Sequence, residues 1–76
     1  MTFGMRLKNL RFEHGITQQE LQLETGISQC TIAHWEKNHA IPSTLSLIKL
    51  SRFFQLTIDE LLKGVEFNEN ADRRSG

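Results

Sequence analysis

The sequence predicts an all-α fold in which five short helices form one domain. Apolar residues recur at spacings of three and four, the period of a helix with one buried face, and do not alternate as in a strand. Four of these stretches follow a residue that favours a helix start: Thr17, Ser28, Ser43 and Thr57. The 76 residues suffice for one small core.

The first helix is expected over residues 3–14. Its buried stripe consists of Phe3, Leu7, Leu10 and Arg11. Gly15 is expected to end this helix, because glycine adopts the left-handed backbone conformation at low cost. Phe12 lies off the buried stripe, so we expect a half-buried surface aromatic at this position.

A helix-turn-helix is expected between residues 17 and 37. Thr17 and Glu20 match a capping box, in which each side chain binds the backbone N–H of the other residue. This start predicts a helix over about residues 18–25, which Gly26 ends. Because the following turn is short, the next helix is expected to cross steeply and to project from the surface.

That projecting helix is expected over residues 29–37, with Ser28 as its N-cap and Asn38 at its end. Its inward residues are Ile32, Trp35 and Glu36. Its outward residues are Gln29, Cys30, Ala33 and His34. Solvated helix faces normally collect Lys and Glu, so an outward face of short and amide side chains indicates a contact surface.

Two more helices are expected, over about residues 44–54 and 58–63. Ser43 caps the fourth helix, whose core stripe consists of Leu47, Ile48, Leu50, Ser51 and Phe54. The residues expected to start and end the fifth helix are Thr57 with Glu60, as a second capping box, and Gly64. Five helices therefore account for the chain as far as residue 64.

Residues 65–76 lose this periodicity and turn polar. We therefore expect a domain over residues 1–64, followed by a mobile C-terminal tail. Val65 and Phe67 are apolar exceptions with no obvious place in the core. We expect them to form, together with the fifth helix, the surface of a homodimer.

Charge and composition limit the possible classes of protein. Nine Lys and Arg balance nine Asp and Glu, whereas a DNA-binding module usually carries a basic excess. The single cysteine, Cys30, excludes an internal disulfide and favours a reducing, cytoplasmic setting. No stretch approaches the roughly 18 apolar residues of a membrane span, and no signal peptide is visible.

Seven short motifs follow one another between Leu7 and Leu62. They read LxxLR (7–11), GITQxEL (15–21), GISQ (26–29), TIxxWE (31–36), PS (42–43), LIKL (47–50) and IDELL (58–62). In this order and at these spacings, they resemble the Cro/phage-repressor (Xre-type) helix-turn-helix family of bacterial and phage regulators. The resemblance covers nearly all of the chain that is expected to be ordered.

The resemblance implies a compact, lambda-repressor-like domain of five helices, with the third helix in the major groove of double-stranded DNA. By position it assigns base reading to Gln29, Cys30 and His34. It assigns phosphate contacts to Gln18, Thr31, Lys37, Asn38 and His39. It also implies a buried ion pair between Arg11 and Glu36, and binding as a homodimer to a two-fold operator.

The chain departs from the family pattern at several positions. Gln22 replaces the alanine that is usual in the middle of the second helix, and we expect its side chain to bend away from the helix crossing. His39 stands where Lys or Arg is common. Cys30 and His34 occupy reading positions that Arg, Gln, Lys or Ser often fill. These differences bear on the affinity and on the DNA sequence that is read, whereas the fold tolerates them.

The chemistry of Gln29 favours base reading, because a glutamine amide can donate to and accept from adenine together. Gln18 stands at a helix N-terminus, where free N–H groups and the helix dipole favour a phosphate. Thr31 can offer its hydroxyl to a phosphate or its methyl group to thymine. For Thr31, a plain position on the helix surface is an equal alternative. For Gln18, a first-turn surface amide is a competing alternative.

Cys30 and His34 lie four residues apart on one helix face, a spacing that also fits two metal ligands. A zinc site needs three or four protein ligands, and only His39 could be a third. We therefore expect no metal, and we expect no cofactor or small-molecule ligand. No constellation of catalytic residues is present, so the sequence does not indicate an enzyme.

The sequence thus predicts a transcriptional regulator of the repressor type that binds DNA sequence-specifically. It is expected in the cytoplasm and is expected to be encoded by a bacterium or a phage. The alternative is a protein-interaction module, antitoxin or antirepressor-like, that keeps the helix-turn-helix fold. The balanced net charge is the main support for the alternative.

Overall fold

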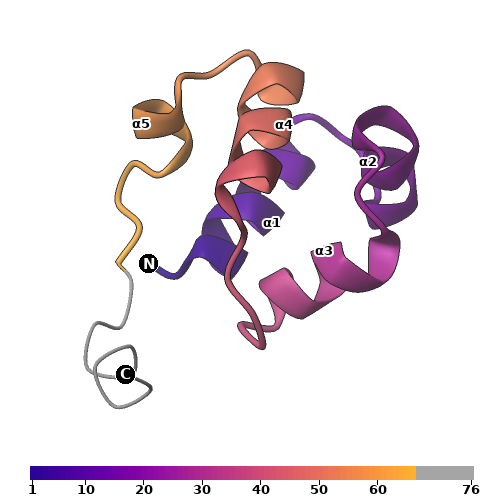
Figure 1. The fold of residues 1–76 in the computed structure, drawn as a ribbon, viewed down its shortest axis with the longest axis horizontal. Coiled ribbons are helices and arrows are strands. Elements are labelled where there is room, and N and C mark those ends of the chain that lie inside the picture. The colour runs from indigo at the N-terminus through magenta and orange to yellow at the C-terminus, as the bar shows by residue number, and fades with distance from the viewer. Residues whose placement is uncertain (67–76) are drawn as a thin grey trace.

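The structure, a computed structural model, describes residues 1–66 and contains five helices in this part of the chain (Figure 1). The helices are α1 (Phe3–Glu13), α2 (Gln18–Thr25), α3 (Gln29–Glu36), α4 (Thr44–Phe54) and α5 (Ile58–Leu61). The all-α prediction is confirmed. The bounds of α2 and α4 are as expected, α1 and α3 end one residue earlier, and α5 ends two residues earlier.

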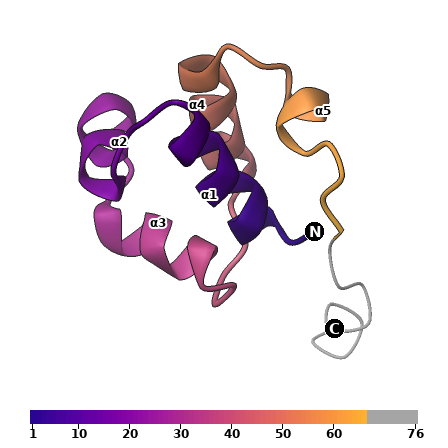
Figure 2. The ribbon, with the colours of Figure 1, turned by 180° about the vertical axis from the view of Figure 1, so that it is seen from behind.

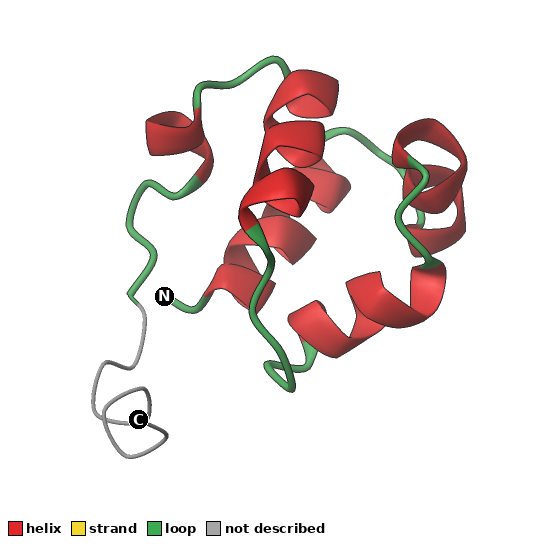
Figure 3. Cartoon of the chain, viewed as in Figure 1, coloured by secondary structure: helices red, strands yellow, loops and turns green. Residues whose placement is uncertain are grey.

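α1 and α4 occupy the middle of the molecule, α4 in front of α1 in Figure 1 and behind it in Figure 2. α2 and α3 lie on one side of this pair, and the short α5 lies on the other. Only loops and turns connect the helices within the described residues (Figure 3). The two helices of the helix-turn-helix therefore form one flank of the molecule.

A hydroxyl side chain caps the start of every helix. The capping residues are Thr2, Thr17, Ser28, Ser43 and Thr57, and each accepts a hydrogen bond from a backbone N–H three residues later. Both expected capping boxes are formed in full. Such a cap satisfies a backbone donor that has no partner within the helix, so local sequence signals define these starts.

The core consists of ten buried apolar residues from the helices and the turn between α2 and α3. They are Phe3, Leu7, Leu10, Leu21, Ile27, Ile32, Trp35, Leu50, Phe54 and Leu61. Ser51 is buried as expected, whereas Leu47 and Ile48 are only half-buried. Phe12 is 64% exposed, so the half-buried position expected for it is wrong. Its ring lies under the guanidinium of Arg11, 5.1 Å from Cζ, and otherwise faces solvent.

α1 and α3 approach each other closely at Gly4. A Cβ atom on Gly4 would lie 2.2 Å from the carbonyl oxygen of Trp35 and 2.7 Å from Oδ1 of Asn38. A real side chain cannot occupy that space without moving α3. Glycine is therefore required at this contact, although Gly4 has no role in the sequence patterns above.

The chain after α5 returns to the N-terminus. The amino group of Met1 donates to the carbonyl of Gly64 at 3.0 Å, and the N–H of Glu66 donates to the carbonyl of Met1 at 2.9 Å. Val65 packs against the core, so the expectation that it has no place there is wrong. Phe67 and the rest of the predicted tail lie outside the described residues.

None of the helices in residues 1–66 combines the length and the apolar character that crossing a lipid bilayer requires.

Candidate nucleic-acid interface

α3 lies at the edge of the molecule and presents one face outward (Figure 1). Its inward residues Ile32, Trp35 and Glu36 are buried, as expected. The outward residues Gln29, Cys30 and His34 are exposed, and Ala33 is half-buried. The three predicted base-reading residues therefore share one accessible surface of α3.

Arg11 of α1 and Glu36 of α3 form a buried ion pair. Nε and Nη2 of Arg11 donate to the two carboxylate oxygens of Glu36 at 2.7 and 2.9 Å. The side chains are only 9% and 3% exposed. Nη1 of Arg11 also donates to the carbonyl of Ile16 at 2.9 Å. The predicted contact is present, and it fixes the C-terminal end of α3 to α1.

These contacts shift the pKa values of both groups. Burial is the largest influence on Glu36 and by itself raises the pKa of the carboxyl group. Hydrogen bonds from Arg11 and Gln18, together with the charges of Arg11 and Lys8, outweigh burial and lower that pKa below its usual value. The hydrogen bond with Glu36 raises the pKa of Arg11, although burial opposes it. Both groups are therefore charged at neutral pH.

Gln18 joins this buried pair from α2. Its Nε2 donates to Oε1 of Glu36 at 3.0 Å, and the residue is half-buried. Gln18 thus connects the first turn of α2 to the last turn of α3. An amide nitrogen carries two hydrogens, so the bond with Glu36 leaves one donor for a phosphate.

Gln22 does not bend away from the helix crossing, and our expectation for it is wrong. Its Oε1 accepts a hydrogen bond from the backbone N–H of Gln29, the first residue of α3. A backbone N–H at this position has no partner inside its own helix. The side chain of Gln22 reaches that donor across the turn, which an alanine cannot do.

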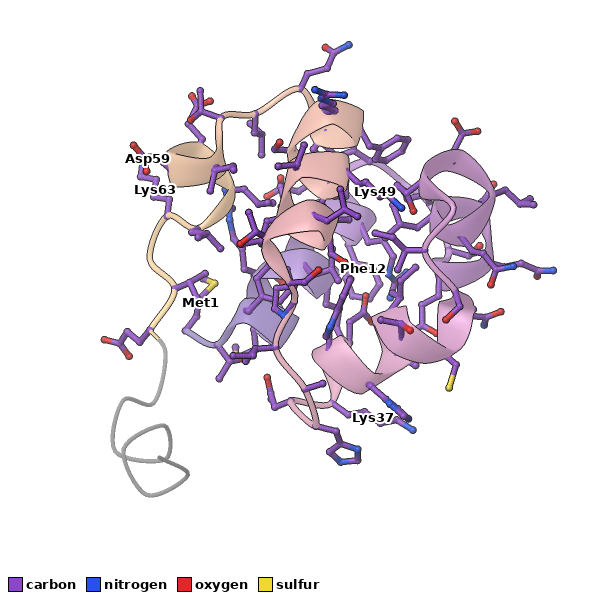
Figure 4. The ribbon with its side chains drawn as sticks, viewed as in Figure 1. Met1, Phe12, Lys37, Lys49, Asp59 and Lys63 are labelled. Atoms are coloured by element: carbon purple, nitrogen blue, oxygen red, sulfur yellow. The ribbon has the colours of Figure 1, made fainter. Side chains whose placement is uncertain are left out.

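The remaining predicted residues lie toward the two ends of α3. Thr31 is in the first turn, where its hydroxyl accepts a hydrogen bond from the hydroxyl of Ser28 at 2.8 Å. Lys37, Asn38 and His39 follow the last turn and are exposed, and Lys37 projects at this end of α3 (Figure 4). Asn38 has a φ of 63°, so it ends the helix as expected.

Cys30 and His34 meet on the outward face of α3, where Sγ lies 3.9 Å from Nε2. The structure of residues 1–66 brings no group of three or more His, Cys, Asp or Glu into a metal-binding arrangement. Two side chains are fewer than a zinc ion requires from a protein. In its described form this pair is therefore a polar contact on the surface of α3.

The sequence patterns did not reveal three residues that join the helices of this domain. Gly4 permits the close contact of α1 with α3, and Gln22 holds the start of α3. Arg6 donates to the carbonyls of Leu61 and Glu60 at 3.0 and 2.7 Å, which connects α1 to α5. The departure of Gln22 from the family pattern was visible in the sequence, but its partner was not.

Comparisons with known proteins support the same interpretation. Residues 7–61 match the family described as helix-turn-helix. The transcriptional activator BcrR of Enterococcus faecalis is 39% identical over 66 residues, which are 87% of this chain and 32% of BcrR. The transcriptional regulator ImmR of Bacillus subtilis (strain 168) is 34% identical over 62 residues, which are 82% of this chain and 49% of ImmR.

This chain therefore spans about a third of BcrR and about half of ImmR. A solved structure of the P22 c2 repressor in complex with a synthetic operator superimposes with a TM-score of 0.76 and 33% identity. The superposition covers 84% of this chain and 97% of that repressor chain. The chain thus belongs to the helix-turn-helix family, in its Cro/phage-repressor (Xre-type) branch.

Proposed function

We propose that this chain binds DNA sequence-specifically as part of a transcriptional regulator, repressor-type, in the cytoplasm of a bacterium or of a phage-infected cell. The observation that carries the proposal is the outward face of α3, with Gln29, Cys30 and His34 exposed on a firmly held helix. The same fold occurs in a repressor solved with its operator. The proposed role needs no catalytic group or cofactor.

Base reading is assigned to the exposed side chains of α3 in the major groove. Gln29 is the main reading residue, because its amide can pair with the N6 and N7 atoms of adenine. Cys30 and His34 stand beside it and complete the reading surface. None of the three is a Lys or an Arg, so this surface supplies discrimination between bases more than bulk attraction to DNA.

Phosphate contacts are assigned to the flanks and ends of α3: Gln18, Thr31, Lys37, Asn38 and His39. Lys37 carries a full positive charge and is exposed at the end of the helix. Gln18 keeps one amide hydrogen besides the one that binds Glu36. Because the net charge of the chain is zero, affinity must come from the local placement of these groups.

Binding is proposed to occur as a homodimer on a two-fold operator, with half-sites about one DNA turn, roughly 34 Å, apart. α5 with the residues after it remains the proposed dimer surface, and Ile58 is 36% exposed there. Val65 no longer supports this surface, because it packs on the core. Sedimentation of a Phe67→Glu variant tests it, and normal dimerisation of that variant would contradict it.

The domain is proposed to comprise residues 1–64, followed by the tail at 65–76, most of which lies outside the described residues. Selection of bound sequences from a random DNA pool tests the whole proposal. We expect an enriched palindrome, and log K falling with log salt by about 0.9 for each neutralised phosphate. A chain that enriches no sequence would contradict sequence-specific binding.

The second candidate is a protein-interaction module with the same fold, such as an antitoxin or antirepressor-like protein. The balance of nine basic and nine acidic residues favours it. The salt experiment separates the two candidates, because the alternative predicts no DNA binding or a flat response to salt.

A further inference from the structure

Two side chains occupy backbone donors at the start of α3. The N–H of Gln29 donates to Oε1 of Gln22, and the N–H of Thr31 donates to Oγ of Ser28 at 3.1 Å. Ser28 is an ordinary N-cap that precedes its own helix. Gln22 differs, because it reaches this end from the middle of α2, seven residues away in the sequence.

Gln18 and Gln22 lie one turn apart on the face of α2 that meets α3. Gln18 binds Glu36 in the last turn of α3, and Gln22 binds Gln29 in the first. Seven residues, or about two helical turns, separate the two points of attachment on α3. Two glutamine amides on one helix therefore hold both ends of the candidate reading helix.

We propose that Gln22 is a positioning residue for base reading by Gln29. This inference rests on the proposed function, because it concerns how the reading helix meets a base pair. Gln29 is the first residue of α3, so no earlier turn of helix supports it. A glutamine must present both its donor and its acceptor to adenine, which requires a fixed backbone. The hydrogen bond from Gln22 provides that constraint.

The hydrogen bond from Gln29 to Gln22 also keeps one backbone N–H at the start of α3 from binding a phosphate. A free N–H at a helix N-terminus commonly binds a phosphate, whereas the N–H of Gln29 is already occupied. Loss of the acceptor at position 22 frees this N–H and removes the constraint on Gln29, so it should lower the discrimination between bases. It should leave the salt slope unchanged, because that slope counts the phosphates neutralised by Lys and Arg, and a backbone N–H carries no full charge.

The test compares three variants of the full chain. Gln22→Met keeps the length of the side chain and removes the acceptor. Gln22→Glu keeps an acceptor for the N–H of Gln29. Gln19→Met is the matched control, because Gln19 is an exposed glutamine on the same helix. Thermal unfolding of each variant shows that the protein measured is folded.

The measured quantity is the ratio of affinities for the selected operator and for a copy changed at one base pair. That base pair is the one whose preference disappears in Gln29→Ala. We expect Gln22→Met to lower this ratio about fivefold, the effect of one hydrogen bond. We expect Gln19→Met to leave it unchanged, and Gln22→Glu to retain most of it even if the added negative charge weakens binding overall.

A second measurement asks whether Gln22 acts through Gln29. In the Gln29→Ala background, Gln22→Met should cause no further loss of discrimination, and the salt slope should match that of the parent in both backgrounds. A further loss in that background would overturn the inference, as would wild-type discrimination in Gln22→Met.

DNA selection by the unmodified chain distinguishes a failure of the positioning role of Gln22 from a failure of the proposed function. If it selects an operator but Gln22→Met discriminates equally well, the positioning role is wrong and the proposed function stands. If the unmodified chain selects no DNA sequence, the proposed function and the positioning role fail together.

Discussion

The guanidinium of Arg11 binds the carboxylate of Glu36 through two hydrogen bonds, 2.7 and 2.9 Å long, across the contact between α1 and α3. Removal of the cation leaves a buried carboxylate whose remaining side-chain donor is Gln18. We expect Arg11→Met to lower the free energy of unfolding by about 3–5 kcal/mol. Urea denaturation measures this loss.

The control for that prediction is the double variant Arg11→Met/Glu36→Met, which removes both charges together. Replacement of a buried ion pair by apolar residues is often neutral. The double variant should therefore be more stable than Arg11→Met alone. Equal stability of the two would show that the cost comes from lost packing and not from an unpaired charge.

Glu36 makes the stability of the fold depend on acidity. Its pKa in the folded state lies below 4.5, the ordinary value that it takes in the unfolded chain. The stabilisation is therefore fully present above the unfolded pKa, and it is lost as the pH falls through the folded pKa. We expect the difference in urea midpoint between wild type and Glu36→Gln to shrink on acidification. A constant difference from pH about 6 to about 3 would contradict this.

Gly4 allows α1 to approach the end of α3. Gly4→Ala adds a methyl carbon that would lie 2.2 Å from the carbonyl oxygen of Trp35. We expect a loss of about 1–3 kcal/mol in unfolding free energy, because overpacking forces the backbone to shift. Asn9→Ala is the control, since Asn9 is exposed on the same helix. A Gly4→Ala variant as stable as Asn9→Ala would contradict the close contact.

Lys37 is the exposed cationic residue that follows the last turn of α3, and we propose that it contacts a phosphate. Lys37→Gln should weaken DNA binding to a similar extent on all sequences and reduce the salt slope by about 0.9. Lys63→Gln is the control, because Lys63 lies beside α5 at the opposite side of the molecule (Figure 4). Equal effects of the two variants would indicate non-specific attraction and no phosphate contact by Lys37.

The helices could be predicted from the sequence to within one or two residues, because the signals for helix starts and ends are local. Thr17 and Thr57 each sit three residues from the glutamate that completes their capping boxes, so both motifs are readable along the chain. The inward residues of α3 followed from the helical period alone. The pairing of Arg11 with Glu36 was accessible only through the family resemblance, because 25 residues separate them.

The sequence by itself determined where each helix begins and which face of it is apolar, since both depend on residues a few positions apart. Tertiary structure alone decided what meets across the helix crossings. It gave Gln22 the N–H of Gln29 as its partner, placed Gly4 against Trp35, and buried Val65 on the core. These contacts depend on the distances and angles between packed helices, and no local rule of sequence contains that information.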